Sequence, residues 1–513
     1  MNKYIKLLIP FIVGIVVYFA GLCSIEFSQV AVVGGVPQLT HGIWIYLSIF
    51  MGVIVGLILE PIPPALVGLI GVAIAVFFKV GPLKSGNPEA VISSKAAIEW
   101  GLSGFSNATV WLIFAAFAIG LGYQQSGLGR RLALTLVKKL GKSTLGLGYA
   151  IALTDGILAP FIPSNTARSG GVIYPIVSSI PPMFDSYPDK NPRKIGGYIM
   201  WVSLAITCVT SSMFLTGLAP NLLAVSTATG AGIPEISWFS WFIAFLPAGI
   251  LLFALTPLLA YIIYPPEVKG SPDIVTWAKD EYSKIGSMTT KEKWMIAISV
   301  FALVFWILSS IGSLKNSIIE LDGTTTAIFV IIFMLATKII SWNDFLSNKP
   351  AWNVLAWFST LVALAGGLKN VGFLDWLSVI LKASLDGFSP LTAIIGLILA
   401  FYLLHYFFAS TTAHVTALLL LFIIMAQAIE GVNVYLATVL MMLSLGIMGI
   451  ITPYGTGPSP VYFGSGYIKG GEFWKLGAIF GLIYLVVFLA IEVPWVLGVV
   501  GDWITPSSIA AAH

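Results

Sequence analysis

Long apolar runs alternate with short polar segments along most of the chain. Many of these runs approach the ~20 residues that a helix needs to cross the hydrocarbon layer. Because lipid offers no partners to backbone polar groups, helices are the expected form of such segments. The pattern predicts an all-α polytopic membrane protein with about eleven transmembrane helices. Clear runs lie near residues 5–23, 43–59, 62–80, 105–125, 196–216, 241–263 and 474–498.

Two apolar stretches are interrupted near their middle by small hydroxyl-bearing residues. Ser164-Asn165-Thr166 interrupts the stretch 145–180, and Ser410-Thr411-Thr412 interrupts the stretch 390–426. The first stretch is too short for two full spans, so a helical hairpin that enters and leaves on one side fits better. Ser, Thr and Asn are the residues that cap a new helix start. The sequence therefore predicts two re-entrant hairpins whose second arms begin at these triplets.

The second half of the chain repeats the plan of the first. Ser410 follows Ser164 by 246 residues, and Trp357 follows Trp111 by the same interval. Two pairs of glycines keep an interval of 245 residues. Several positions in one register favour a duplication over chance. Five predicted spans separate equivalent points, so the copies are expected to be inverted repeats.

Composition agrees with a membrane protein. Hydrophobic residues make up 58 % of the chain and charged residues 9 %, whereas soluble domains carry roughly 25 % charged residues. The net charge of +4 is small and spread over loops, so nucleic acid is not an expected partner. Cys23 and Cys208 lie among apolar residues, so neither a disulfide framework nor a metal site is expected. No cofactor is expected either.

Charge in the loops sets the expected orientation. The segment 126–142 carries five cations around an apolar stripe at helical spacing, which is typical of a helix lying on the membrane surface. The positive-inside rule places it on the cytoplasmic side. Its counterpart at 371–384 has far fewer cations and is expected outside. With the polar stretch 265–293 as a cytoplasmic linker, the N-terminus is expected in the cytoplasm and the C-terminus outside. The five cations are Arg130, Arg131, Lys138, Lys139 and Lys142.

Interrupted helices in inverted repeats are typical of secondary transporters, whose substrates bind at the repeat interface near the membrane midplane. The free N–H groups and the positive dipole end of a half-helix suit a carboxylate. Two further spans are interrupted, at 216–221 and at 452–458. The two triplets are therefore expected to form the halves of one site for a small anion.

A potential cation follows each triplet by two residues, Arg168 in the first hairpin and His414 in the second. Charge within the membrane costs at least ~2.5 kcal/mol, and the favoured interpretation is that both residues belong to the anion site. The alternative for Arg168 is that it snorkels to the interface or forms an ion pair with Asp155. The alternative for His414 is a structural role as a hydrogen-bonded histidine in the core. His405 is assigned a structural role. Because imidazole titrates near pH ~6.5, transport is expected to depend on pH partly through His414.

The segments SNTARSGG, TGLAPN, ASTTAHVTAL and TPYGTGPSP strongly resemble the divalent anion/sodium symporter family. They are most similar to its exchanger branch of bacterial and chloroplast di- and tricarboxylate antiporters. The resemblance extends from about residue 60 to the last span. It implies a protein of the bacterial plasma membrane rather than an enzyme. A paired-histidine metal helix, a nucleophile elbow and a phosphate loop are all missing from the sequence.

The resemblance also implies a homodimer in lipid, in which a transport domain slides against a scaffold by an elevator-like motion. Scaffold parts are expected at 1–140 and 294–385, transport parts at 141–264 and 386–513, and a linker at 265–293. Substrate carboxylates are expected between the hairpin tips and the interrupted spans. The residues implied are Ser164, Asn165, Thr166, Ser410, Thr411, Thr412, Gly217, Pro220, Asn221, Thr452, Pro453 and Gly455.

One departure from the family pattern bears on ion coupling. Sodium-coupled members carry Ser-Asn-Thr in both hairpins, whereas Thr411 replaces the asparagine here. The hypothesis is that Arg168 and His414 take the place of the sodium ions. It predicts sodium-independent exchange of dicarboxylates of the succinate, malate, fumarate or 2-oxoglutarate type, or of tricarboxylates. A sodium-coupled dicarboxylate uptake symporter with the same fold remains the alternative.

Overall fold

The computed structural model describes residues 3–27, 41–59, 61–83, 91–311, 321–374, 376–377, 381 and 387–506. Regular structure in these ranges is helical, apart from an isolated β-bridge between Ser143 and Gly270. Nine helices of this part of the chain are long and apolar enough to cross a membrane. The expected all-α membrane fold is confirmed, while the total of eleven spans stays a prediction.

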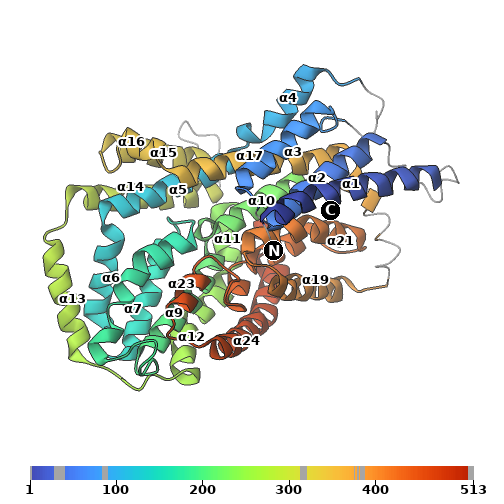
Figure 1. Ribbon diagram of the computed structural model, residues 1–513. Coiled ribbons are helices and arrows are strands. Elements are labelled where there is room, and N and C mark those ends of the chain that lie inside the picture. Colours follow the sequence, from blue (N-terminus) through green and yellow to red (C-terminus); the bar gives the residue numbers. More distant parts are fainter. Residues whose placement is uncertain are drawn as a thin grey trace.

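One group of helices occupies an upper band in Figure 1. Within it, α5 packs against α15 and α17, and α17 packs against α3. Segments from both halves of the sequence thus form one layer. The group consists of α1 (Lys3–Phe27), α2 (His41–Leu59), α3 (Pro64–Phe77), α4 (Ser94–Leu102), α5 (Ala108–Ser126), α14 (Thr290–Ser310), α15 (Gly323–Ala336), α16 (Trp342–Leu346) and α17 (Lys349–Asn370).

Apart from α13 (Pro272–Ile285) at the left edge of Figure 1, the remaining helices form a thicker body beneath this band, and it too draws on both halves of the chain. Its members are α6 (Leu128–Leu140), α7 (Thr144–Leu158), α8 (Tyr174–Val177), α9 (Gly196–Met213), α10 (Ala219–Gly230), α11 (Trp238–Ala244), α12 (Leu246–Ile263), α19 (Pro390–Leu404), α20 (Thr411–His414), α21 (Leu420–Ala428), α22 (Val434–Leu443), α23 (Ser459–Gly464), α24 (Gly470–Val487), α25 (Val493–Trp495) and α26 (Gly501–Ile504).

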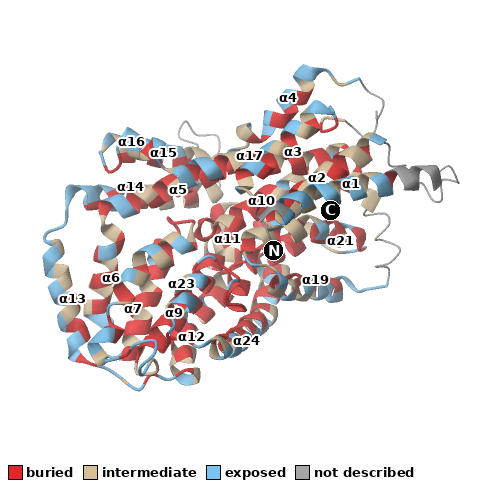
Figure 2. Ribbon diagram, in the orientation of Figure 1, coloured by how far each residue is buried: buried red, intermediate tan, exposed pale blue. Residues whose placement is uncertain are grey.

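Burial identifies the centre of this body. The span of α9 is 94 % buried, whereas that of α14 is only 28 % buried. The contrast is visible in Figure 2, where α9 is red and α14 carries pale blue segments. The two helices have similar apolar sequences, so their environments differ through packing. α9 is the core helix of the lower body, and the open face of α14 is available to lipid.

The two hairpins begin in the same way. Ser143 caps α7 by accepting a hydrogen bond from the amide of Gly146 at 3.0 Å, and Ser389 caps α19 through the amide of Thr392 at 3.3 Å. These serines lie 246 residues apart, which is the interval between the triplets. A serine cap satisfies an N–H group that would otherwise lack a partner at the helix start. The inverted orientation of the two copies stays a prediction.

The predicted surface helix and linker differ from expectation in two respects. Residues 265–293 contain a further helix, α13 (Pro272–Ile285), which packs along α6. Arg131, expected on the charged face of α6, is buried and forms an ion pair with Glu292 at 2.6 Å. It also donates to the carbonyls of Gly286 and Ser287. The pair joins α6 to the first turn of α14. Half of the residues of the second surface helix, expected at 371–384, lie outside the described ranges.

Candidate functional site

The tips of the two hairpins have the same local geometry. In the first hairpin, Oγ of Ser164 accepts a hydrogen bond from the amide of Ala167 at 3.2 Å. In the second, Oγ of Ser410 accepts from the amide of Ala413, also at 3.2 Å. Each serine therefore caps a helix that begins at the next residue. The expectation that the hydroxyl-bearing triplets mark helix starts agrees with both contacts.

After each cap the helix widens. The second arm of the first hairpin is a π-helix over Thr166–Ile173, and that of the second becomes a π-helix over Val415–Leu419. π-Helical segments inside longer helices are frequent at functional sites because they re-aim side chains. Asn165 and Thr411 are buried at the tips, while Thr166 is exposed. Each tip thus offers both enclosed and accessible polar groups.

The segment 452–458 connects the two tips. Nδ2 of Asn165 donates to Oγ1 of Thr456 at 2.7 Å, and Oγ1 of Thr411 donates to the carbonyl of Gly455 at 3.2 Å. Gly457 leaves room for the first tip, because an added Cβ there would lie 1.9 Å from Oγ1 of Thr166. Asn165 and Thr411, which lie 246 positions apart in the sequence, therefore bond to adjacent residues of one interrupted span.

The other interrupted span contacts both hairpins. Its Gly217 carbonyl accepts a hydrogen bond from Arg168 at 2.8 Å, and α10, which follows, packs against α20 of the second hairpin. Pro220 stands in the first turn of α10. Nδ2 of Asn221 donates to the carbonyls of Ser211 and Phe214, which holds the break in shape. The predicted residues of this span therefore lie beside the tips.

Several polar atoms near the tips have no partner in the part of the chain that the structure describes. They include Oδ1 of Asn221 and Oγ1 of Thr452, both from residues that the sequence assigned to the site. Pro453 is buried next to Thr452. Buried polar groups are normally hydrogen-bonded, so those left unpaired call for an explanation.

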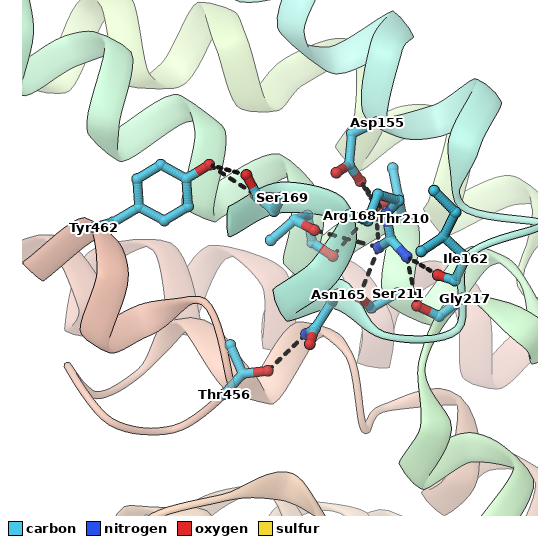
Figure 3. A network of polar contacts seen from close by, with 11 residues as sticks. Asp155, Ile162, Asn165, Arg168, Ser169, Thr210, Ser211, Gly217, Thr456 and Tyr462 are labelled. Atoms are coloured by element: carbon cyan, nitrogen blue, oxygen red, sulfur yellow. Dashed lines mark hydrogen bonds and ion pairs between the residues drawn. The ribbon is translucent and has the colours of Figure 1, made fainter. Parts of the chain in front are cut away.

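Arg168 is enclosed by protein partners (Figure 3). Its side chain is completely buried, and Nε lies 3.1 Å from Oδ2 of Asp155. One terminal nitrogen donates to the carbonyls of Ile162 and Gly217, and the other to hydroxyls on α9. The hydroxyls of α9 that accept these hydrogen bonds belong to Thr207, Thr210 and Ser211. The hydroxyl of Thr210 also bonds to Asp155.

This geometry corrects the expected role of Arg168. The sequence interpretation placed a free cation beside the substrate, whereas the structure has the alternative, an ion pair with Asp155. A charge buried without a partner is strongly destabilising, and pairing with full hydrogen bonding offsets that cost. Arg168 therefore anchors the first tip to α7, α9 and the interrupted span.

The two histidines of the second hairpin have different surroundings. Nε2 of His405, which the sequence interpretation left structural, lies 2.8 Å from the carbonyl of Gly455. His414 is fully buried among the rings of Phe401, His405 and Phe408. Neither of its nitrogens has a partner among the residues described. Such surroundings disfavour a charged ring, so the geometry does not support a pH switch at His414.

His405 appears in the sequence only as a polar residue at the end of an apolar run, and no local pattern predicts its contact with Gly455. The first and second hairpins nevertheless each contact a glycine carbonyl of an interrupted span. Arg168 bonds to Gly217 and His405 bonds to Gly455, both at 2.8 Å. A second hydrogen bond joins the first hairpin to α23, because the hydroxyls of Ser169 and Tyr462 lie 2.8 Å apart (Figure 3). Side chains thus connect each hairpin to an interrupted span.

Comparison with known proteins agrees with this architecture. The sequence matches the family model described as the sodium:sulfate symporter transmembrane region over residues 23–501. It is 44 % identical over 457 residues to the L-tartrate/succinate antiporter of Escherichia coli (strain K12), which covers 88 % of this chain and 92 % of that protein. The L-tartrate/succinate antiporters of Shigella sonnei (strain Ss046) and Shigella flexneri match to the same extent.

Two solved structures share the fold at low sequence identity. The YdaH transporter of Alcanivorax borkumensis has a TM-score of 0.56 at 12 % identity and covers 85 % of this chain and 98 % of that one. MtrF of Neisseria gonorrhoeae has a TM-score of 0.50 at 14 % identity, over 85 % of this chain and 95 % of that one. At these identities the likeness concerns the fold alone.

The buried ion pair predicts a specific pattern of stability. Arg168→Met leaves Asp155 without its partner and is expected to destabilise the protein by about 3–5 kcal/mol. The double variant Asp155→Leu/Arg168→Met removes both charges and is expected to recover part of that loss. Thermal unfolding of the purified proteins in detergent measures both effects. Arg130→Met, at an exposed position of α6, is the control and should change little. A double variant no more stable than Arg168→Met would contradict the assignment.

Proposed function

We propose a transport function for this chain, which belongs to the family of the sodium:sulfate symporter transmembrane region. It exchanges small dicarboxylates across the bacterial plasma membrane. The observation that carries the proposal is the meeting of two capped helix starts on one interrupted span, at Thr456 and Gly455. The named activity of the relatives, L-tartrate/succinate antiport, supports the choice of dicarboxylates.

The tips supply donors of the kind that a carboxylate needs. The first N–H groups of a helix have no partner within the helix. Ser164 accepts only from Ala167, which leaves the amides of Asn165 and Thr166 for a ligand. Ser410 likewise accepts from Ala413 in the other hairpin. With one tip per carboxylate, the two ends of a dianion are held by backbone amides, hydroxyls and helix dipoles.

The substrate-binding residues proposed from the sequence are retained. Ser164, Thr166 and Ser410 are accessible at the tips, while the buried residues Asn165, Thr411 and Gly455 hold the tips on the interrupted span. The unpaired oxygens of Asn221 and Thr452 accept from a substrate hydroxyl or from bound water. Oxygens of this kind suit the hydroxyl groups of a hydroxylated dicarboxylate such as tartrate or malate.

Exchange is proposed to be independent of sodium. Two glycine carbonyls of the interrupted spans already accept from Arg168 and His405. Side-chain N–H groups therefore occupy backbone oxygens that would otherwise be open to a cation. In the second hairpin, His405 rather than His414 is therefore proposed to take the place of a sodium ion. The sodium-coupled symporter remains the second candidate, because the family model carries that name.

Alternating access is proposed to be an elevator-like movement in a homodimer. The upper band of Figure 1 together with α6 is the scaffold, and the rest of the lower body moves against it. Consistent with this division, α13 joins the end of α12 to α14 as a helical strap. The parts assigned from the sequence are 1–140 and 294–385 for the scaffold, and 141–264 and 386–513 for the transport domain. The N-terminus is proposed to be cytoplasmic and the C-terminus external.

The central experiment is efflux of labelled succinate from sodium-free proteoliposomes. Release is expected when external unlabelled succinate or tartrate is present and not when the outside holds buffer alone. Protein-free liposomes are the control for leak, and external sulfate tests the other anion in the family description. Release that requires sodium and proceeds without a counter-substrate would establish the symporter instead.

A second prediction concerns the first tip. Gly457→Ala places a methyl group against the Thr166 hydroxyl, which must turn away. The KM for succinate is expected to rise about tenfold, equivalent to about 1.4 kcal/mol, with a small effect on thermal stability. Gly464→Ala is the matched control, because an added Cβ there meets nothing within 4 Å. Thr166→Ala added to Gly457→Ala should not weaken binding further. Equal KM values for Gly457→Ala and Gly464→Ala would argue against a substrate contact at Thr166.

A further inference from the structure

A large cavity lies beside the first hairpin, away from the two tips. Its volume is about 700 Å³. One wall is the turn between α5 and α6 with the start of α6, a second is the returning arm of the first hairpin, and a third is α13. Its lining includes the polar side chains of Gln124, Arg130, Ser179 and Glu281. A mixed polar lining distinguishes this cavity from a gap that lipid would fill.

One face of the hairpin arm leads from the tip to this cavity. Thr166, Gly171, Pro175 and Ser179 are all exposed and follow one another at intervals of five, four and four residues. These intervals match the turns of a π-helix that continues as an α-helix, so the four residues lie along one side. All four side chains are small, and an added Cβ at Gly171 would meet nothing within 4 Å. A row of exposed residues therefore runs along the arm from Thr166 to the three residues that line the cavity.

The distance along this row is short. Gly171, which lines the cavity, follows Thr166 by five residues. A π-helix rises less per residue than the ~1.5 Å of an α-helix, so that separation is at most about 7.5 Å along the axis. A dicarboxylate is of comparable length, so a molecule in the cavity is about one molecular length from the tip.

A cluster of three charged side chains with an excess of one cation lies at the cavity wall, where Arg130 and Glu281 line the cavity and Lys284 stands behind them. Arg130 lies 2.9 Å from Oε2 of Glu281, and Nζ of Lys284 lies 2.6 Å from Oε1 of the same carboxylate. One acid thus stands between two cations. The Arg130 side chain is 59 % exposed, and only its NH2 nitrogen has a hydrogen-bond partner within the described part of the protein. Its remaining N–H groups are free to meet an anion.

We propose that this cavity is the vestibule through which the substrate dianion reaches the hairpin tips, with Arg130 as the first contact. Glu281 holds Arg130 at the wall and competes with the incoming carboxylate for the guanidinium group of Arg130. A charged cavity with low-dielectric walls concentrates counter-ions and raises their rate of entry. The inference rests on the proposed dicarboxylate exchange. It adds a second, shallower subsite on the side of the membrane that α6 faces.

The test compares three variants that each replace a charged side chain by glutamine. Arg130→Gln removes the proposed contact, Glu281→Gln removes its competitor, and Lys139→Gln removes an exposed cation of α6 that does not line the cavity. The KM for labelled succinate is measured in membrane vesicles of both orientations, with saturating counter-substrate. Measurements at low ionic strength are repeated in 1 M choline chloride, where the Debye length falls to about 3 Å.

Arg130→Gln is expected to raise KM roughly three- to tenfold on one face only, with the maximal rate unchanged and the effect reduced by salt. Glu281→Gln should lower KM on that same face, and Lys139→Gln should leave it unchanged. An equal rise for Lys139→Gln and Arg130→Gln, equal effects on both faces, or a rise in KM for Glu281→Gln would overturn the vestibule. If the wild-type protein does not exchange succinate at all, that result would instead refute the proposed function.

Discussion

The burial of Arg168 is the constraint on which the first half of the site depends. A guanidinium in the interior of a membrane protein requires a counter-charge and a partner for each N–H group. Asp155 on α7 supplies the charge, and the carbonyls of Ile162 and Gly217 accept hydrogen bonds. Hydroxyls of α9, the most buried helix of the lower body, complete the set. One side chain thereby fixes the hairpin turn, the core helix and an interrupted span relative to one another.

The second hairpin reaches an equivalent attachment without a permanent charge. His405 and Thr411 both bond to the carbonyl of Gly455, and Asn165 of the first hairpin bonds to the next residue, Thr456. The two tips share the same serine cap but differ in how they are held. Because one interrupted span holds both tips, neither half of the chain forms the site alone. Movement of the site as a unit is therefore compatible with these contacts.

Two neighbouring arginines of α6 have different roles because they lie on different sides of the helix. Arg131 turns inward and pairs with Glu292, which joins α6 to α14. Arg130, about 100° further around the helix, faces the cavity beside the first hairpin. One arginine therefore stabilises the junction between the strap α13 and the upper band. The other remains accessible to an anion.

The sequence by itself determined the all-α membrane fold, the family and the positions of the two helix starts, and these predictions are confirmed or agree with the geometry. Each of these features is local, because hydrophobic run length and capping residues act within a few positions. Only the tertiary structure decided the partners of Arg168, the role of His405 and the burial of Arg131. Their partners lie up to 161 residues away in sequence. No local pattern reports which carbonyl or carboxylate the packing will bring within hydrogen-bond distance.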